Sequence, residues 1–393
     1  MKYFFAALAL CGCFLLQSLD ISSSEAKDLF SYAKALQSQG LVALFNPGFA
    51  LSAKLAFHSS SLLPKSNVAL RIVPFIFTLA SIYLLYLQLE KLRAKDKFIA
   101  LFSLSLLPVM LAAGCAVNDG SLLLFLLLLF CHLHPKKSCA IPAFFILLLP
   151  QASLIFSLAL FAFYAQKRLI KGSALALLLF LFAVFLHGFD FGGKPRGYFT
   201  DVLGLLALAF TPILFLYIFY CIYRDLLALK KRKSLDLKLS FAATGLFLCL
   251  MLSLRQKLDL EYFLPFLLLY YPRCVLSFAH SYYLRLPMHR GFYKSSLNLA
   301  LSLIFSFALI LLGSEALFYT DLEPKKHFLI NYKGAKALSD ELKKLDISCL
   351  ANASQRLGFY GIENSSKCPK IRECEEAEIF IYLGKNKVFY CLD

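Results

Sequence analysis

Apolar runs alternate with short polar or basic connections along the first three hundred residues. Several runs approach the roughly 20 residues that a helix needs to cross the ~30 Å hydrocarbon core of a bilayer, and Pro, Gly or charged residues separate them. The pattern predicts an all-α polytopic membrane protein with about eleven transmembrane helices. The predicted spans are 3–17, 68–89, 98–113, 120–134, 139–150, 152–166, 172–187, 202–223, 239–254, 262–281 and 296–314.

Two polar stretches interrupt this pattern. The first, residues 18–67, separates the first two predicted spans and has room for amphipathic helices. The second follows the last span and predicts a small α/β domain with a helix over 333–345, a strand over 347–351 and a terminal hairpin of strands 377–383 and 387–392. We therefore expect a transmembrane domain, 1–314, and a C-terminal domain, 315–393.

The basic residues orient the predicted helices. Hydrophobic residues make up 60% of the sequence, more than in soluble domains. Of the 41 Lys and Arg and the 24 Asp and Glu residues, 12 of each group lie from Glu315 onwards, so the whole net charge of +17 precedes that point. Clusters of basic residues beside apolar helices indicate the side of the membrane on which a connection lies and the contacts with lipid headgroups. We therefore expect no nucleic-acid partner. The clusters are Lys2, 91–95, 136–137, 167–171, 224–238 and 285–294.

Placing every basic cluster in the cytoplasm gives a consistent path through a bacterial inner membrane. On this path the N-terminus is cytoplasmic, whereas the 18–67 loop and the C-terminal domain are periplasmic. An alternative for the N-terminus is a cleaved signal, because Leu10-Cys11-Gly12-Cys13 faintly resembles a lipoprotein cleavage box.

Four cysteines lie in the predicted periplasmic domain, namely Cys349, Cys368, Cys374 and Cys391. An even number of cysteines in a small exported domain predicts two disulfides, with three pairings open. A zinc site is the alternative, although the tight Cys-x-x-Cys spacing of such sites is missing.

The first loop contains two acids that could carry chemistry, Glu25 and Asp28. Ser22 and Glu25 stand three residues apart, which is the spacing of a helix capping box, and this is the structural interpretation of Glu25. The functional interpretation is a carboxylate at the membrane surface that takes a proton from an attacking hydroxyl group.

Charged residues also stand where later predicted helices begin. Asp119 directly precedes an apolar run, and an acid at the edge of a membrane helix is either a functional group or a helix cap. Arg255 and Lys257 precede Tyr262, and such cations either hold a lipid phosphate or lie at the interface beside an aromatic belt. The glycine-rich 188–200 loop carries Lys194 and Arg196, which could grip a phosphate or a sugar, or belong to a flexible loop.

Taken together, these stretches resemble the GT-C superfamily of polyprenyl-phosphate-sugar glycosyltransferases, and the protein O-mannosyltransferase and aminoarabinose transferase branch in particular. Counting back from Gly40 puts Glu25 at the family's catalytic Asp and Ala33 at its small helix residue. Asn46-Pro47-Gly48 resembles the family's Pro-containing turn, and Arg71 its Arg at the start of the second helix. The stretches Ala116-Val117-Asn118-Asp119 and Tyr262-Phe263-Leu264-Pro265 resemble motifs before two later helices.

The sequence departs from the family pattern in three ways. Glu25 replaces an Asp, Ala26 and Leu29 replace an acid and a Tyr, and Phe45-Asn46 replaces the Glu-Lys of aminoarabinose transferases. The last change argues against that substrate and its metal-binding acid. The resemblance therefore implies no definite cofactor, and a divalent metal is the one candidate.

The resemblance implies an enzyme with the GT-C fold that moves a sugar from a polyprenyl-phosphate carrier to a lipid, glycan or protein acceptor, with inversion. Glu25 would be the general base and Asp28 its substitute, while Asp119 would orient the acceptor or a loop. The substrate and phosphate ligands would be Arg255, Lys257, Tyr262, Arg196, Lys194 and Arg71. Two alternatives are a transporter or flippase for lipid-linked sugars and a non-catalytic assembly protein.

Overall fold

The computed structural model describes residues 19–40, 42–46, 48–62, 66–188, 197–232, 235–313, 332–374, 379–383 and 386–392. The predicted span 3–17 lies outside the described residues. The chain forms two compact units, which we call the helical unit (Pro74–Ala308) and the terminal unit (Lys2–Val73 with Leu309–Asp393). The domain boundary at residue 314 remains a prediction, whereas compactness groups the first loop with the C-terminal residues.

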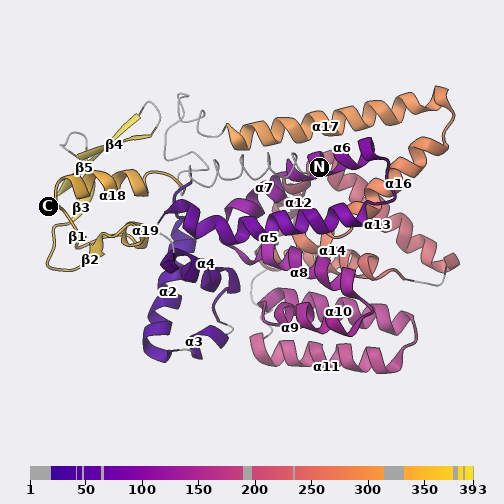
Figure 1. Ribbon diagram of the computed structural model, residues 1–393, viewed down its shortest axis with the longest axis horizontal. Coiled ribbons are helices and arrows are strands. Elements are labelled where there is room, and N and C mark those ends of the chain that lie inside the picture. The colour runs from indigo at the N-terminus through magenta and orange to yellow at the C-terminus, as the bar shows by residue number, and fades with distance from the viewer. Residues whose placement is uncertain are drawn as a thin grey trace. The chain divides into compact units, whose positions relative to one another are not determined.

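Apolar helices dominate the chain from α5 to α17 (Figure 1). Within the described ranges, five helical segments are long and apolar enough to cross a membrane, or six if the bent pair α6 and α7 counts as one. The protein is therefore a multi-pass membrane protein, and the predicted count of eleven spans is not confirmed. The helices are α5 (Asn67–Gln88), α6 (Ala94–Ser105), α7 (Pro108–Cys115), α8 (Asp119–Leu133), α9 (Ala140–Leu147), α10 (Pro150–Gln166), α11 (Ile170–His187), α12 (Tyr198–Phe210), α13 (Pro212–Arg232), α14 (Leu237–Ser253), α15 (Leu264–Leu268), α16 (Tyr271–Leu284) and α17 (Arg290–Leu312). Short 3-10 turns are η1 (Lys137–Cys139), η2 (Leu260–Tyr262) and η3 (Pro287–His289).

The predicted single span 202–223 is wrong, because the structure has two helices there, α12 and α13. The break falls at Thr211, whose φ of 65° lies in the left-handed region that non-glycine residues rarely adopt. Pro212 follows and has no N–H with which to continue the preceding helix. The predicted span 98–113 is likewise divided into α6 and α7, which are bent by 58° at the break before Pro108.

The helical unit packs around aromatic side chains. α10 lies along α11 and also contacts α14 (Figure 1). The rings of Phe156 on α10 and Phe241 on α14 stack with centroids 5.4 Å apart, and Phe130 on α8 meets Phe156 edge-on at 4.9 Å. A Cβ at Gly245 would lie 2.8 Å from Cβ of Phe266, so the absence of a side chain allows α14 and α15 to pack closely.

The terminal unit combines the first loop with an α/β region. Its helices α2 (Ser23–Gln39), α3 (Val42–Phe45) and α4 (Leu51–Leu62) pack together, and α19 (Gln355–Phe359) packs on α2. The predicted C-terminal helix is present as α18 (Ala335–Lys344) and the predicted hairpin as antiparallel β4 (Ile379–Leu383) and β5 (Asn386–Leu392). The sequence did not predict three elements, α19, β2 (Glu363–Asn364) and β3 (Ile371–Cys374). β2 pairs in parallel with β1 (Cys349–Leu350), and β3 pairs with β5.

Two disulfides close the C-terminal part of this unit. Cys349 is bonded to Cys368, and Cys374 is bonded to Cys391. They flank a small apolar core that includes Leu342, Leu350 and Ile362, each of which is fully buried. A core of this size supplies little stability by itself, so covalent links between its strands and loops restrict the unfolded chain.

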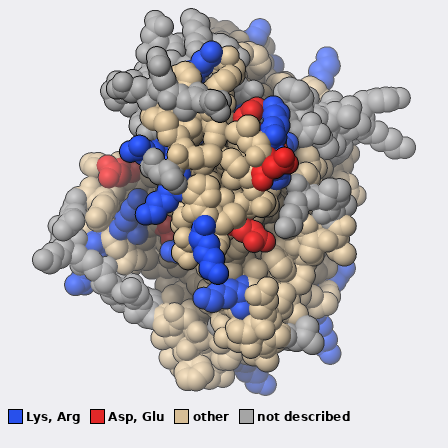
Figure 2. Space-filling model, turned by 90° about the vertical axis from the view of Figure 1, so that its left-hand side faces the viewer, with Lys and Arg blue, Asp and Glu red and all other residues tan. Residues whose placement is uncertain are grey.

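Charges of both signs lie on the surface. On the face drawn in Figure 2, basic and acidic side chains lie close together around a largely uncharged centre. One exposed pair in the terminal unit joins Lys344 to Glu341 across 2.7 Å. Exposed pairs of this kind contribute only about 0–1 kcal/mol, so the buried charges described next are of greater interest.

Candidate functional site

Glu25 is held at the start of α2 by the predicted capping box. Its Oε2 accepts a hydrogen bond of 2.8 Å from the backbone N–H of Ser22, and Ser22 Oγ accepts one of 3.3 Å from the N–H of Glu25. The same carboxylate forms an ion pair with Arg71, whose Nη2 lies 3.2 Å from Oε2. Arg71 is fully buried and Glu25 is 5% exposed. The structure therefore brings together two residues that the sequence singled out for different roles.

A second set of polar residues, which sequence analysis missed, surrounds this pair. Arg71 Nη2 also donates to the backbone oxygen of Asp20 at 2.6 Å. The Tyr360 hydroxyl donates to Asn67 Oδ1 at 2.6 Å and accepts from the N–H of Ile21 at 3.1 Å. Burial raises the pKa of Tyr360, and nearby Asp20 raises it further, so the hydroxyl keeps the proton that it donates.

The C-terminal residues thus hold the segment in front of α2. Arg356 on α19 donates from Nε to the oxygen of Ile21 at 2.8 Å and from Nη2 to the oxygen of Lys333 at 3.0 Å. Asp20 Oδ2 accepts from the N–H of Lys336 at 3.1 Å. The contacts with Asp20 and Ile21 join residues more than three hundred positions apart in the sequence, and no local pattern indicates such contacts.

Asp28 and Lys54 occupy different environments in the first loop. Asp28 lies on the exposed side of α2, where partial desolvation and the neighbouring Glu25 raise the pKa of its carboxyl group while Lys27 lowers it. Lys54 is buried, and its Nζ donates to the backbone oxygens of Leu44 at 3.0 Å and Asn46 at 2.7 Å. Lys54 therefore holds the backbone at Asn46, the first residue of the stretch that resembles the family's Pro-containing turn. Pro47 itself lies outside the described residues.

Asp119 and Tyr262, which sequence analysis named separately, meet in the helical unit. Asn118 caps α8 by accepting from the N–H of Gly120, and Asp119 is the first helical residue and 1% exposed. The Tyr262 hydroxyl lies 3.5 Å from Asp119 Oδ2. A Cβ on Gly120 would lie 3.3 Å from the oxygen of Glu261, so the start of α8 and the η2 turn approach closely.

The remaining predicted cations lie on or near this turn or outside the described residues. Arg255 and Lys257 are exposed, and neither side chain forms an ion pair within the described part of the chain. Their charges are thus available to a ligand. Lys194 and Arg196 fall between residues 188 and 197 and outside the described ranges. Among the described residues, no group of three or more His, Cys, Asp or Glu is arranged to hold a metal ion.

These features define a class of protein: a multi-pass membrane protein with an acid-bearing first loop that folds together with a disulfide-linked C-terminal region. No protein-family model and no curated protein sequence matches the chain. Solved structures do match it. They are structures of ArnT, an aminoarabinose transferase of the GT-C superfamily, and the chain has an ArnT-like fold.

Two crystal structures of ArnT from Cupriavidus metallidurans match with a TM-score of 0.56. The apo structure is 12% identical in sequence, and the match covers 94% of this chain and 92% of that one. The structure bound to undecaprenyl phosphate is 14% identical, and the match covers 91% of this chain and 84% of that one. At this level of identity the likeness shows the fold, and the predicted GT-C resemblance is supported at that level.

Proposed function

We propose that the protein is a membrane glycosyltransferase that moves a sugar from a polyprenyl-phosphate carrier to a lipid, glycan or protein acceptor. The reaction takes place at the outer face of a bacterial inner membrane, with the N-terminus in the cytoplasm and residues 315–393 in the periplasm. The single observation that carries this proposal is the likeness to ArnT over 94% of the chain, together with the undecaprenyl phosphate named in the second ArnT structure.

The proposed reaction is a direct displacement at the anomeric carbon. The acceptor hydroxyl oxygen forms a bond to this carbon, the bond from the carbon to the carrier phosphate breaks, and the configuration inverts. Glu25 takes the hydroxyl proton as general base, a contribution of typically 10²–10⁴-fold. The ion pair with Arg71 and the capping box fix the carboxylate in one orientation, as a general base requires. The same contacts fit the structural interpretation of Glu25, so the variants described next distinguish the two roles.

The departing polyprenyl phosphate carries negative charge, which basic side chains stabilise. We assign this role to Arg255 and Lys257, because both are exposed and neither is engaged in an ion pair among the described residues. Tyr262 is proposed as a substrate ligand and Asp119 as a group that orients the η2 turn. Arg71, which the sequence assigned to phosphate, is proposed instead to position Glu25.

The decisive experiment replaces Glu25 by Gln and compares the envelope lipids and glycans of cells by mass spectrometry. Cells with the original protein should contain a component heavier by one sugar residue, and cells without the gene should lack it. Glu25→Gln keeps an oxygen for the Ser22 N–H but removes the base, so we expect at least about a 100-fold loss of this component.

Glu25→Gln leaves the buried Arg71 without its anionic partner, so the amount of folded protein in the membrane is measured for each variant, and two further variants serve as comparisons. Glu25→Asp keeps a carboxylate and should retain measurable transfer. A double variant, Arg255→Gln with Lys257→Gln, alters only exposed side chains and should fold normally while lowering transfer. If Glu25→Gln is folded and fully active, Glu25 is not the base. If deleting the gene changes no lipid or glycan, lipid and glycan acceptors are excluded, and a protein acceptor, a transporter or an assembly protein remains.

A further inference from the structure

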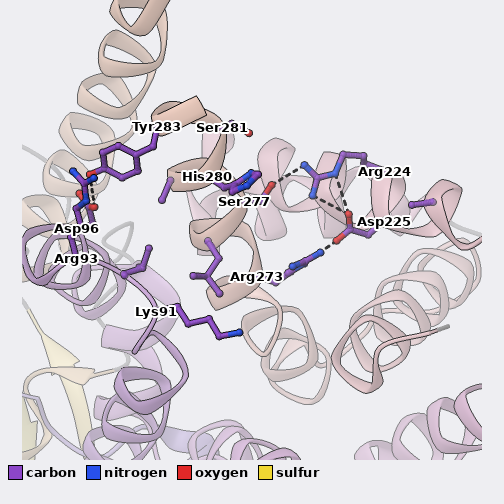
Figure 3. A pocket seen from close by; sticks show the side chains of 14 residues that line it. Lys91, Arg93, Asp96, Arg224, Asp225, Arg273, Ser277, His280, Ser281 and Tyr283 are labelled. Atoms are coloured by element: carbon purple, nitrogen blue, oxygen red, sulfur yellow. Dashed lines mark hydrogen bonds and ion pairs between the residues drawn. The ribbon is translucent and has the colours of Figure 1, made fainter. Parts of the chain in front are cut away.

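A large pocket lies within the helical unit, at helix ends that carry basic clusters. Its volume is about 810 Å³, toward the upper end of the roughly 300–1,000 Å³ of small-molecule sites. In Figure 3, Arg93 from the α5–α6 connection and Asp96 from the first turn of α6 lie on one side, Arg224 and Asp225 from α13 lie on the other, and α16 lies between them. These helix ends are the ones that the positive-inside rule places in the cytoplasm.

Both acids that line the pocket are already engaged. Asp225 Oδ1 lies 2.9 Å from Arg224 Nη2, and its Oδ2 lies 3.2 Å from Arg273 Nε. The Tyr270 hydroxyl also donates to Asp225 Oδ2, at 2.6 Å. Asp96 accepts a hydrogen bond of 2.6 Å from the Tyr283 hydroxyl. The two carboxylates are thus held in the wall of the pocket by protein groups. The cations that line the pocket outnumber them.

The excess charge rests on two side chains from the α5–α6 connection. Lys91 is exposed, and its ammonium group makes no ion pair or hydrogen bond within the described ranges. Arg93 is exposed as well, and its guanidinium carbon lies 4.1 Å from the centre of the Tyr283 ring. Stacking on this ring orients the guanidinium without neutralising it. With Arg224 and Arg273, the pocket has four strong cations against two acids.

We propose that this pocket binds a phosphate ester. Arginine guanidinium groups match phosphate oxygens in pairs, and a lysine adds a point charge. Leu92, Ala228 and Leu276 line the same pocket and offer apolar contact to the organic part of the ester. Two sources share this chemistry, a lipid headgroup of the cytoplasmic leaflet and a phosphorylated molecule dissolved in the cytoplasm. None of the residues that line this pocket has a role in the proposed transfer reaction.

Native mass spectrometry of the full-length protein in a neutral detergent tests this proposal. The lipid probe is dioleoyl phosphatidylglycerol, the phosphate-free control is dioleoylglycerol, and the soluble probe is glycerol 3-phosphate. We expect phosphatidylglycerol to be retained in preference to dioleoylglycerol. Lys91→Gln should weaken its apparent affinity by about fivefold, the effect of one lysine near an anionic headgroup.

The matched control is Lys95→Gln, which removes a charge that is also exposed, four residues further on in the first turn of α6, from a side chain that does not line the pocket. It should leave retention unchanged. If glycerol 3-phosphate displaces the lipid, the soluble source is supported, and if it does not, the lipid source is supported. Equal retention of phosphatidylglycerol and dioleoylglycerol, or equal effects of the two lysine variants, would overturn the proposal. Neither result depends on transfer activity, so failure here leaves the proposed function intact.

Discussion

The carboxylates of Glu25 and Asp225 both bind arginines, and their surroundings differ. Glu25 and Arg71 in the terminal unit are almost completely buried. Asp225 in the helical unit binds Arg224 and Arg273, whose side chains are 36% and 44% exposed, and it lines a large pocket. The first pair has little contact with solvent, whereas the second leaves its arginines open to a ligand. The same ionic chemistry thus serves to fix a local structure in one place and to shape a charged surface in the other.

Burial decides how much each pair contributes. Removing one partner of a buried ion pair leaves an uncompensated charge in a medium of low dielectric constant, at a cost of about 3–5 kcal/mol. Exposed or half-exposed pairs are screened by water and contribute about 0–1 kcal/mol. The two regions should therefore respond very differently to neutral substitutions.

Arg71→Met should give the largest effect on stability, because it leaves Glu25 buried without this cation. We expect the free energy of unfolding, measured by reversible denaturation in detergent micelles, to fall by about 3–5 kcal/mol. Lys34→Met, an exposed change on α2, should stay within about 0.5 kcal/mol of the original protein. A loss equal to that of the control would show that the pair contributes nothing to the fold.

Tyr360→Phe should have an intermediate effect. It removes the hydroxyl that donates to Asn67 and accepts from Ile21, both in a buried setting. The expected loss is about 1–3 kcal/mol in the same measurement. Tyr382→Phe serves as the control, because that side chain is 59% exposed and its described contacts involve the ring alone. Equal values for the two variants would contradict the proposed importance of the buried network.

Asp225→Asn should have the smallest effect on stability, about 1 kcal/mol or less, because both arginines are partly exposed. The same change releases one positive charge in the pocket, so retention of phosphatidylglycerol should rise. Opposite signs for stability and binding would distinguish this cluster from the Glu25 pair. Unchanged or weaker lipid retention would argue against a role for the pocket cations in binding.

Local patterns predicted part of the fold and of the site. The spacing of Ser22 and Glu25 predicted the capping box, because both partners lie in one helical turn. The apolar run ending at Gln88 and the hairpin β4–β5 were also evident, since each depends on a short-range pattern. By contrast, nothing in the run through Thr211 and Pro212 other than the proline indicated that one predicted span would become two helices.

Contacts between distant segments could not be predicted in the same way. Arg71 was recognised as important, but its partner was not, because the pairing with Glu25 depends on how α5 and α2 pack. Asp225 was counted within a basic cluster that indicates topology. An acid at the end of an apolar helix is costly and is a reason to look for a partner, and with this rule the cluster could have been found.

Ile21 donates a hydrogen bond to the Tyr360 hydroxyl and accepts one from Arg356, and these bonds have a consequence for biosynthesis. Chains are synthesised from the N-terminus, at about 5–20 residues per second. The segment before α2 leaves the ribosome more than three hundred residues before its partners on and after α19. The environment of Glu25 is therefore completed only after the intervening membrane helices have been made. A nascent chain that stops early would carry this acid without its finished surroundings.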